Sequence, residues 1–492
     1  MLPSAAAPAA STERWSPRLW ATLVVLCAAL FLDSLDVSMV GVALPSIRTD
    51  LHLSTDALQW VVSGYVLGYG GLLLLGGRAA DLLGRRRVFL VALAVFAVAS
   101  LFGGLVTSGG LLIASRFIKG AAAAFTAPAG LSIITTTFAE GPARNRALSI
   151  YTTCGASGFS LGLVLSGLLT EVGWRWTFLL PFPLALLALA AGLRLIPRQE
   201  RPVRDGLGYD LAGAVTATGA LLLLVYTVTQ AQSAGWASLR TILSLLAVLV
   251  LAAAFVVIEL RSAHPLVRLG ILRSGTLARA NLSGISMFGA YVAFQFIATL
   301  YLQSLLGWSA LQMALSFLPA GALVALSATK IGGLVDRFGT TRLLLIGFPA
   351  AVLGYANFLR IGPHSDFLTV ILPTMLLLGL HFALTFPALN IQATAGVADA
   401  EQGLASGLVN TSFQIGGAVV LAVTTALVTA GGTSSPQAQL AGYRHGLLVV
   451  LGVSAAGMLT TLLALRRPRR RTNWGVPDYQ PAPQREDASA EV

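Results

Sequence analysis

The chain has 492 residues, of which 56% are hydrophobic and 11% are charged, and its net charge is +12. A soluble domain carries about 25% charged residues, so this composition excludes a soluble globular protein. It predicts an all-α integral membrane protein, because every backbone polar group in lipid needs a partner within its own helix. The positive charge falls in short loops and in the C-terminal tail, which indicates membrane topology and not a nucleic-acid partner.

Apolar runs long enough to cross a bilayer, about 20 residues each, recur along the whole chain. We predict fourteen membrane helices, near 18–46, 58–76, 88–106, 110–137, 146–170, 176–196, 210–231, 239–260, 277–305, 311–333, 341–360, 367–393, 403–430 and 444–466. Arginine-rich loops alternate with neutral ones between these runs. The positive-inside rule then places both termini in the cytoplasm. The expected location is the plasma membrane of a bacterium.

The first predicted helix carries two acids near its middle, Asp33 and Asp36. A carboxylate at that depth costs about 2.5–3.5 kcal/mol to insert. The two acids are three residues apart and share a helix face, so they resist joint ionisation and one is expected to hold a proton near neutral pH. A carboxyl that gains and loses a proton suits a proton-coupled carrier. The alternative is that fixed partners neutralise both acids and that their role is structural.

The fourth predicted helix carries two cations, Arg116 and Lys119, within its apolar run. At 1.5 Å of rise per residue, Asp36 and Lys119 both lie about 15 Å from the same membrane face. We therefore predict a network that joins Asp33 and Asp36 to Arg116 and Lys119. The alternative for the two cations is snorkelling or an unrelated packing role.

An internal repeat links residues 76–87, GGRAADLLGRRR, with residues 332–342, GGLVDRFGTTR, since both fit G-x3-D-x2-G-x2-R. Both segments are predicted to be cytoplasmic loops after the second helix of a six-helix half, and we call them the gate segments. The predicted arrangement is 6 + 2 + 6: a tail at 1–17, a bundle at 18–196, a linker with two inserted helices at 197–275, a bundle at 276–466 and a tail at 467–492. The candidate gate residues are Gly77, Asp81, Gly84, Arg85, Arg87, Asp336, Gly339 and Arg342. The alternative is a pair of plain basic loops.

Two further sets of residues are candidates for the transport path. Small residues on the fifth helix allow close helix approach, as a sliding surface or by simple packing; they are Gly158, Gly162, Ser166 and Gly167. Polar side chains within apolar runs are candidates for a central cavity or, alternatively, for hydrogen bonds between helices; they are Gln59, Gln295, His381, Asn390, Asn410 and Gln414.

The motifs resemble those of the major facilitator superfamily, in particular its fourteen-helix drug:proton antiporter branch. GRAADLLGRRR is similar to the superfamily's signature between helices 2 and 3. LDVSMVGVALP, residues 35–45, resembles the branch's helix-1 signature, with Asp36 on the acidic position and Gly41 where Asn is usual. Asp33 is an addition to that signature.

The fourth and fifth helices carry the resemblance further. RFIKGAAAAFTAPAG, residues 116–130, is similar to the helix-4 signature R-x2-Q-G, with Lys119 in place of Gln. GLVLSGLLTEVGWRWTF, residues 162–178, resembles the helix-5 antiporter signature, with Leu163 in place of Pro and Ser166 in place of one Gly.

The resemblance implies a monomeric, proton-driven exporter that works by alternating access. Its partners would be protons, the lipid bilayer and an amphipathic drug, antibiotic or natural product, with cations among the candidates. The sequence contains no G-x4-G-K-[ST] loop, no clustered Cys/His metal site and no catalytic constellation, so we expect no cofactor, no metal and no enzyme activity. Two alternatives stay open: a carrier of the same fold for one metabolite, and a non-transporting membrane sensor.

Overall fold

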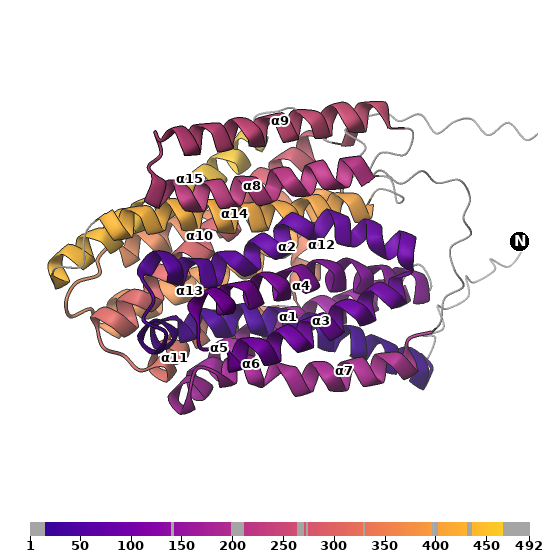
Figure 1. The fold of residues 1–492 in the computed structure, drawn as a ribbon, viewed down its shortest axis with the longest axis horizontal. Coiled ribbons are helices and arrows are strands. Elements are labelled where there is room, and N and C mark those ends of the chain that lie inside the picture. Colours follow the sequence, from indigo (N-terminus) through magenta and orange to yellow (C-terminus); the bar gives the residue numbers. More distant parts are fainter. Residues whose placement is uncertain are drawn as a thin grey trace, which may run out of the picture.

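The computed structural model describes residues 15–138, 142–197, 211–262, 270–271, 274–327, 330–395, 397, 402–430 and 435–465. Within these residues every regular element is helical (Figure 1). The elements are α1 (Pro17–Asp50), α2 (Thr55–Leu83), α3 (Arg85–Leu105), α4 (Gly109–Thr137), α5 (Pro142–Val172), α6 (Trp176–Leu179), α7 (Pro181–Leu195), α8 (Leu211–Ala234), α9 (Leu239–Arg261), α10 (Gly275–Thr299), η2 (Leu300–Leu305), α11 (Ala310–Ser327), α12 (Ile331–Phe358), η3 (Phe367–Ile371), α13 (Leu372–Thr394), α14 (Gln402–Ala430) and α15 (Pro436–Leu465).

The helices confirm the predicted membrane fold. Twelve helical segments of the described chain are long and apolar enough to cross a membrane, and α8 contains a further, shorter apolar stretch. Three of the twelve join neighbouring elements: α6 with α7, α10 with the π-helical η2, and the π-helical η3 with α13. With α2 and α8, the structure places a helix at each of the fourteen predicted spans.

The gate segments differ from the prediction, because most of their residues are helical. Gly77 and Asp81 lie within α2, which continues to Leu83, and α12 already begins at Ile331. The loop prediction was wrong here because alanine and leucine extend a helix beyond its apolar core.

The third position of the repeat is where the chain turns in both gate segments. Gly84, between α2 and α3, has φ 93°, and Gly339, at a kink within α12, has φ 74°. A Cβ at either glycine would meet nothing within 4 Å. The left-handed backbone, not lack of space, is therefore what favours glycine at both positions. The two gate segments therefore share a left-handed glycine at the same position of the repeat as well as a sequence pattern.

The two six-helix groups, α1–α7 and α10–α15, pack differently at the two ends of the bundle. We call these the Asp50 end, where α1 ends, and the Arg85 end, where α3 begins. At the Asp50 end one hydrophobic cluster contains residues of both groups, such as Leu44 and Ile47 with Phe294. At the Arg85 end each group has its own cluster, around Phe89 in one and Phe348 in the other. Among the described residues, the extended core that both groups share lies at the Asp50 end, and a small cluster of Val66, Val225 and Ala418 joins α2, α8 and α14.

The groups meet along two seams. On one side α2 contacts α14, and on the other α5 contacts α11. The inserted hairpin of α8 and α9 covers the α2–α14 seam, because α8 packs against both of those helices. Figure 1 shows α8 between α9 and α14, with α9 at the edge of the molecule. The outer helix α9 exposes an apolar face, as a helix in contact with lipid should; it includes Leu243, Leu246, Leu249 and Val250.

Candidate functional site

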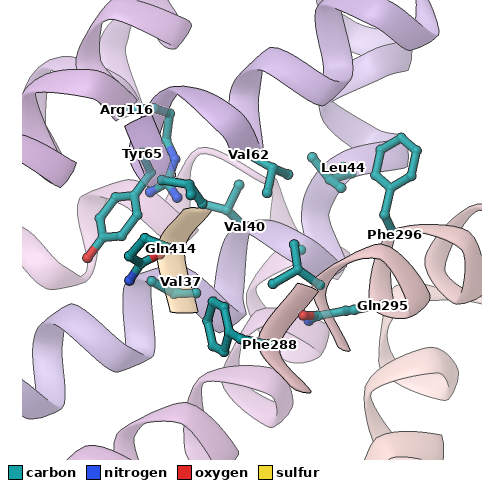
Figure 2. Close-up of a pocket in the computed structure, with 13 residues that line it drawn as sticks. Val37, Val40, Leu44, Val62, Tyr65, Arg116, Phe288, Gln295, Phe296 and Gln414 are labelled. Carbon is teal, nitrogen blue, oxygen red and sulfur yellow. The ribbon is translucent and has the colours of Figure 1, made fainter. Parts of the chain in front are cut away.

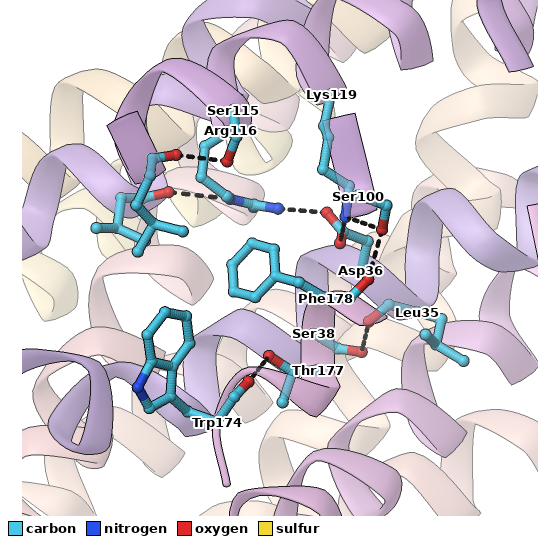
Figure 3. Close-up of polar contacts among 12 residues, drawn as sticks. Leu35, Asp36, Ser38, Ser100, Ser115, Arg116, Lys119, Trp174, Thr177 and Phe178 are labelled. Atoms are coloured by element: carbon cyan, nitrogen blue, oxygen red, sulfur yellow. Dashed lines mark hydrogen bonds and ion pairs between the residues drawn. The ribbon is translucent and has the colours of Figure 1, made fainter. Parts of the chain in front are cut away.

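The centre of the site is the carboxylate of Asp36 on α1, which contacts two cations of α4 (Figure 3). Arg116 Nη1 donates to Asp36 Oδ2, and Lys119 Nζ donates to Asp36 Oδ1. The side chains of Asp36, Arg116 and Lys119 are 0%, 2% and 0% exposed. The two cations are three residues apart, so they lie on one face of α4 and reach the same carboxylate. The predicted contact between the first and fourth helices is confirmed.

Arg116 has further partners on α2 that hold its guanidinium in place. Its Nε donates to the carbonyl oxygen of Val61 at 3.1 Å. Its Cζ lies 4.6 Å from the ring centroid of Tyr65, within cation–π range. The guanidinium therefore joins α1, α2 and α4. Sequence reasoning missed Tyr65, because tyrosine in an apolar run usually indicates core packing.

Lys119 is enclosed by residues of α3 and α6. Its Nζ donates to Ser100 Oγ at 3.0 Å and lies 4.8 Å and 5.2 Å from the ring centroids of Phe96 and Phe178. Ser100 Oγ in turn donates to the carbonyl oxygen of Phe178 at 2.7 Å. These contacts replace the water that a buried ammonium loses. Asp36 thus sits in a polar network that draws on five helices.

Asp33 takes a different partner from the one predicted. Thr126 Oγ1 donates to Asp33 Oδ2 at 3.0 Å, and the Asp33 side chain is 8% exposed. Among the described contacts Asp33 forms no hydrogen bond or ion pair with Arg116 or Lys119, which corrects the predicted four-residue network. The reason is that Asp33 lies nearly one helical turn closer to the Arg85 end than Asp36 does, at the level of Thr126. Thr126 lies seven residues after Lys119 on the same face of α4, a spacing that was visible in the sequence.

A small cavity lies between the two groups of helices, beside Arg116 (Figure 2). It is lined by Val37, Val40, Gly41, Leu44, Val62, Tyr65, Val66, Arg116, Phe288, Val292, Gln295, Phe296 and Gln414. Gln295 and Gln414 were predicted as cavity residues, and the structure places them there. The volume of about 50 Å³ is far below the roughly 300–1,000 Å³ of a drug-sized site. At this place the two groups leave little room between them. A wider, open hollow of about 480 Å³ lies between the groups at the Asp50 end, where its lining includes Arg48 of α1 and Gln303 of η2.

The other four polar candidates do not line this cavity. Gln59 is fully buried on α2. Asn390 and Asn410 each donate to the carbonyl oxygen four residues earlier on their own helix, at 2.8 Å and 2.9 Å. His381 Nδ1 lies 2.9 Å from the carbonyl oxygen of Gly347 and joins α13 to α12. The contact of His381 fits the alternative of hydrogen bonds between helices, whereas the contacts of Asn390 and Asn410 stay within their own helices and fit neither expectation.

The small residues of α5 allow close contact with two other helices. A Cβ at Gly158 would lie 2.4 Å from the carbonyl oxygen of Phe31, and one at Gly162 would lie 2.1 Å from Ser38 Oγ. Ser166 Oγ donates to the carbonyl oxygen of Met39 on α1, the helix that also carries Phe31 and Ser38. A Cβ at Gly167 would instead lie 2.7 Å from the Cβ of Ala314 on α11. These contacts show packing of α5 on both groups of helices.

Gly158→Ala is expected to lower the stability of the folded protein by about 1–3 kcal/mol, because the new methyl group would overlap backbone atoms of α1. Thermal unfolding of the purified protein, followed by tryptophan fluorescence, measures the effect. The matched control is Gly452→Ala on α15, where a Cβ meets nothing within 4 Å. Equal unfolding temperatures for the two variants would contradict the packing role.

The contacts described for the first gate segment lie within one six-helix group. Arg86 donates from Nε to the carbonyl oxygen of Ile196 at 2.9 Å and from Nη2 to that of Leu193 at 2.7 Å. It thereby satisfies carbonyl groups at the end of α7. The gate candidates chosen from the sequence include its neighbours Arg85 and Arg87 but not Arg86. The side chains of Asp81 and Asp336 lie outside the described part of the chain, so the gate role of these two acids stays a prediction.

The family model for the Major Facilitator Superfamily matches residues 26–421 of the chain. The chain belongs to the Major Facilitator Superfamily. Two solved structures of transporters show the same fold. The nucleoside transporter NupG has a TM-score of 0.61 at 14% identity, covering 92% of this chain and 100% of its own. The human organic anion transporter MFSD10 has a TM-score of 0.60 at 17% identity, covering 91% of this chain and 100% of its own.

Relatives within this superfamily match over almost their whole length. The puromycin resistance protein pur8 of Streptomyces alboniger is 37% identical over 461 residues, which cover 90% of either chain. The cephamycin export protein CmcT of Amycolatopsis lactamdurans is 37% identical over 478 residues, covering 96% of this chain and 98% of its own. The match therefore includes the inserted hairpin as well as both six-helix groups.

Proposed function

We propose that this protein is a proton-coupled exporter of amphipathic antibiotics or related natural products. The observation that carries the proposal is the buried network of Asp36, Arg116 and Lys119 beside a cavity between two six-helix groups. Binding sites of transporters with repeated halves lie near the bilayer midplane between those halves. The names of the relatives, a resistance protein and an antibiotic export protein, support the substrate class.

The transport cycle would alternate between states open at opposite ends of the bundle. The shared core at the Asp50 end and the separate cores at the Arg85 end support an assignment of this structure to the state closed at the Asp50 end. The arginines of the loops, by the positive-inside rule, support a cytoplasmic location for the Arg85 end. The protein would then be an inward-facing monomer in a bacterial plasma membrane, with both termini cytoplasmic. Its parts would be bundles 18–196 and 276–466, joined by 197–275.

The two membrane acids would have different roles in coupling. Both oxygens of Asp36 contact cations, so protonation of Asp36 would remove the partner of Arg116 and Lys119. Asp33 accepts a hydrogen bond from the neutral hydroxyl of Thr126. It can take up a proton without depriving a contacting cation of its anion. We therefore assign proton uptake and release to Asp33, and the positioning of Arg116 at the cavity wall to Asp36.

Asp33→Asn is expected to reduce proton flux driven by an antibiotic gradient at least tenfold in proteoliposomes, with little change in unfolding temperature. The amide cannot exchange a proton, but its oxygen can still accept the hydrogen bond from Thr126. The control is Asp366→Asn, an exposed acid that caps η3, because Asn is an equally good cap. Full flux in Asp33→Asn would mean that another group carries the proton.

The export function itself is tested with everted membrane vesicles that hold an imposed pH gradient. Puromycin and a cephamycin are suitable first probes, because the two relatives described above are named for these antibiotics. We expect uptake that collapses when the gradient is dissipated. Uptake of one compound only would favour the metabolite carrier, and a phenotype that survives Asp33→Asn and Asp36→Asn in folded protein would favour the sensor.

A further inference from the structure

Gln295, on α10 of the second six-helix group, places an amide in the wall of the central cavity (Figure 2). The residue is 8% exposed, and its Nε2 has no hydrogen-bond partner among the described residues. A buried donor without an acceptor costs about 1–3 kcal/mol. The cost would be recovered if a bound molecule supplied the acceptor. The amide is therefore placed as a ligand contact would be.

The space for this amide is left open by Gly41 on α1. A Cβ at Gly41 would lie 2.8 Å from Gln295 Nε2, closer than a carbon and an amide nitrogen can approach without movement. Gly41 stands where the helix-1 signature of the antiporter branch has Asn. In this chain the amide at that place comes from the second six-helix group instead of the first. Gly41 and Gln295 thus form one pair, in which the small residue accommodates the large one.

The charge of the cavity wall indicates which molecules the amide would meet. Arg116 is the charged side chain among the residues that line the cavity, whereas its partner Asp36 is not one of them. The rest of the wall is mainly apolar, with Val40 and Phe288 as examples. A cationic substrate would meet a guanidinium across a medium of low dielectric, which is unfavourable. A neutral or anionic molecule with acceptor oxygens would meet donors.

We propose that Gln295 is a substrate-binding residue that selects neutral or anionic amphipathic molecules by donating from Nε2 to one of their acceptor oxygens. Gly41 contributes by leaving room for the amide. The inference rests on the proposed export function and names the substrate class of that same site. It differs from the expectation, based on the membrane acids, that cations are among the substrates.

The experiment measures binding of three probes to the purified full-length protein by isothermal titration. Chloramphenicol is neutral, cefalotin carries a carboxylate, and ethidium is a permanent cation. We expect Gln295→Ala to weaken binding of chloramphenicol and cefalotin about five- to tenfold, the value of one hydrogen bond. Gln295→Glu should weaken cefalotin further and strengthen ethidium. The matched control is Gln312→Glu, an exposed position where the carboxylate can keep the cap on Ser309.

A swap of the pair provides a second readout that does not rely on loss alone. Gly41→Asn in the Gln295→Ala background returns an amide to the same space from the opposite helix. We expect this double variant to bind cefalotin more tightly than Gln295→Ala by at least threefold. If the role of Gln295 were purely structural, Gly41→Asn would not restore cefalotin binding to the Gln295→Ala variant.

The outcomes separate this inference from the proposed function. Tightest binding of ethidium by the wild type, or probe affinities that ignore both Gln295 variants, would overturn the inference and leave export intact. Binding of chloramphenicol or cefalotin that depends on Gln295, without transport driven by a pH gradient, would overturn export and leave the binding role intact. Binding of none of the three probes would overturn the inference, and the uptake assay with everted vesicles would still decide export.

Discussion

Asp36→Asn is expected to destabilise the folded protein by about 3–5 kcal/mol, because it leaves two buried cations without their anion. Arg116 and Lys119 are 2% and 0% exposed, so water cannot replace the lost carboxylate. Thermal unfolding of purified protein should show the loss directly. A fall in transport by this variant would therefore not by itself identify Asp36 as the proton carrier.

A double variant tests this explanation. Lys119→Gln restores the residue that is usual in the helix-4 signature, and its amide can still donate to Asp36, so its own cost should be small. Combined with Asp36→Asn, it removes one of the two unpaired cations. We expect Asp36→Asn/Lys119→Gln to be more stable than Asp36→Asn alone, with a coupling energy of about 1–3 kcal/mol in a double-mutant cycle.

The control for the charge network is an exposed acid with similar partners. Asp50 Oδ2 accepts from Arg175 Nη1 at 2.6 Å and from Trp174 Nε1 at 3.0 Å. The Asp50 and Arg175 side chains are 45% and 36% exposed. Asp50→Asn should therefore cost less than about 1 kcal/mol. A cost for Asp36→Asn no larger than this would show that the buried cations do not depend on Asp36.

Gly167→Leu is expected to reduce transport at least tenfold in a protein that still folds, because a large side chain there would separate α5 from α11 at the Asp50 end. Even a Cβ added at Gly167 would lie 2.7 Å from the Cβ of Ala314 and 2.9 Å from the Cα of Leu311. Overpacking of this kind costs about 1–3 kcal/mol. If the cost falls only on the state closed at the Asp50 end, the balance between the two access states shifts by about fivefold to more than a hundredfold.

Labelling of a cysteine measures that shift. Leu302 is fully buried in the core that the two groups share, so Leu302→Cys, in a background without the native cysteines, should resist an impermeant maleimide. Adding Gly167→Leu should make it reactive. Gly452→Leu, in open space on α15, is the matched control and should leave the cysteine protected. Protection that persists in Gly167→Leu would show that the seam tolerates the added volume.

The parts of the structure set by depth in the membrane were predictable from sequence. The length of the apolar runs and the alternating arginines predict the helices, and counting residues from the membrane face predicts the contact of Asp36 with Lys119. The ends of the helices were less predictable. Residues 77–83 were expected to form a loop, but they continue α2, because helix propensity does not end where lipid ends.

The parts that depend on the rotation of each helix about its axis could not be predicted. Helices of this protein are apolar on all sides, so hydrophobic periodicity does not show which side faces the cavity. Gln295 and Gln414 line the cavity, whereas Asn390 and Asn410 bond to their own helices, although all four looked alike in sequence. For the same reason Asp33 was predicted to contact the two cations of α4. Its actual partner, Thr126, is neutral and does not stand out in the sequence.

The hairpin of α8 and α9 makes the two seams differ in how they face the bilayer. An internal repeat alone would make the two seams equivalent, but α8 covers the α2–α14 seam and shields it from acyl chains. The α5–α11 seam has no such cover among the described helices, and lipid-facing leucines such as Leu161 and Leu318 lie on its two helices. Of the two seams between the described groups, the α5–α11 seam is therefore the one that faces the bilayer without a covering helix.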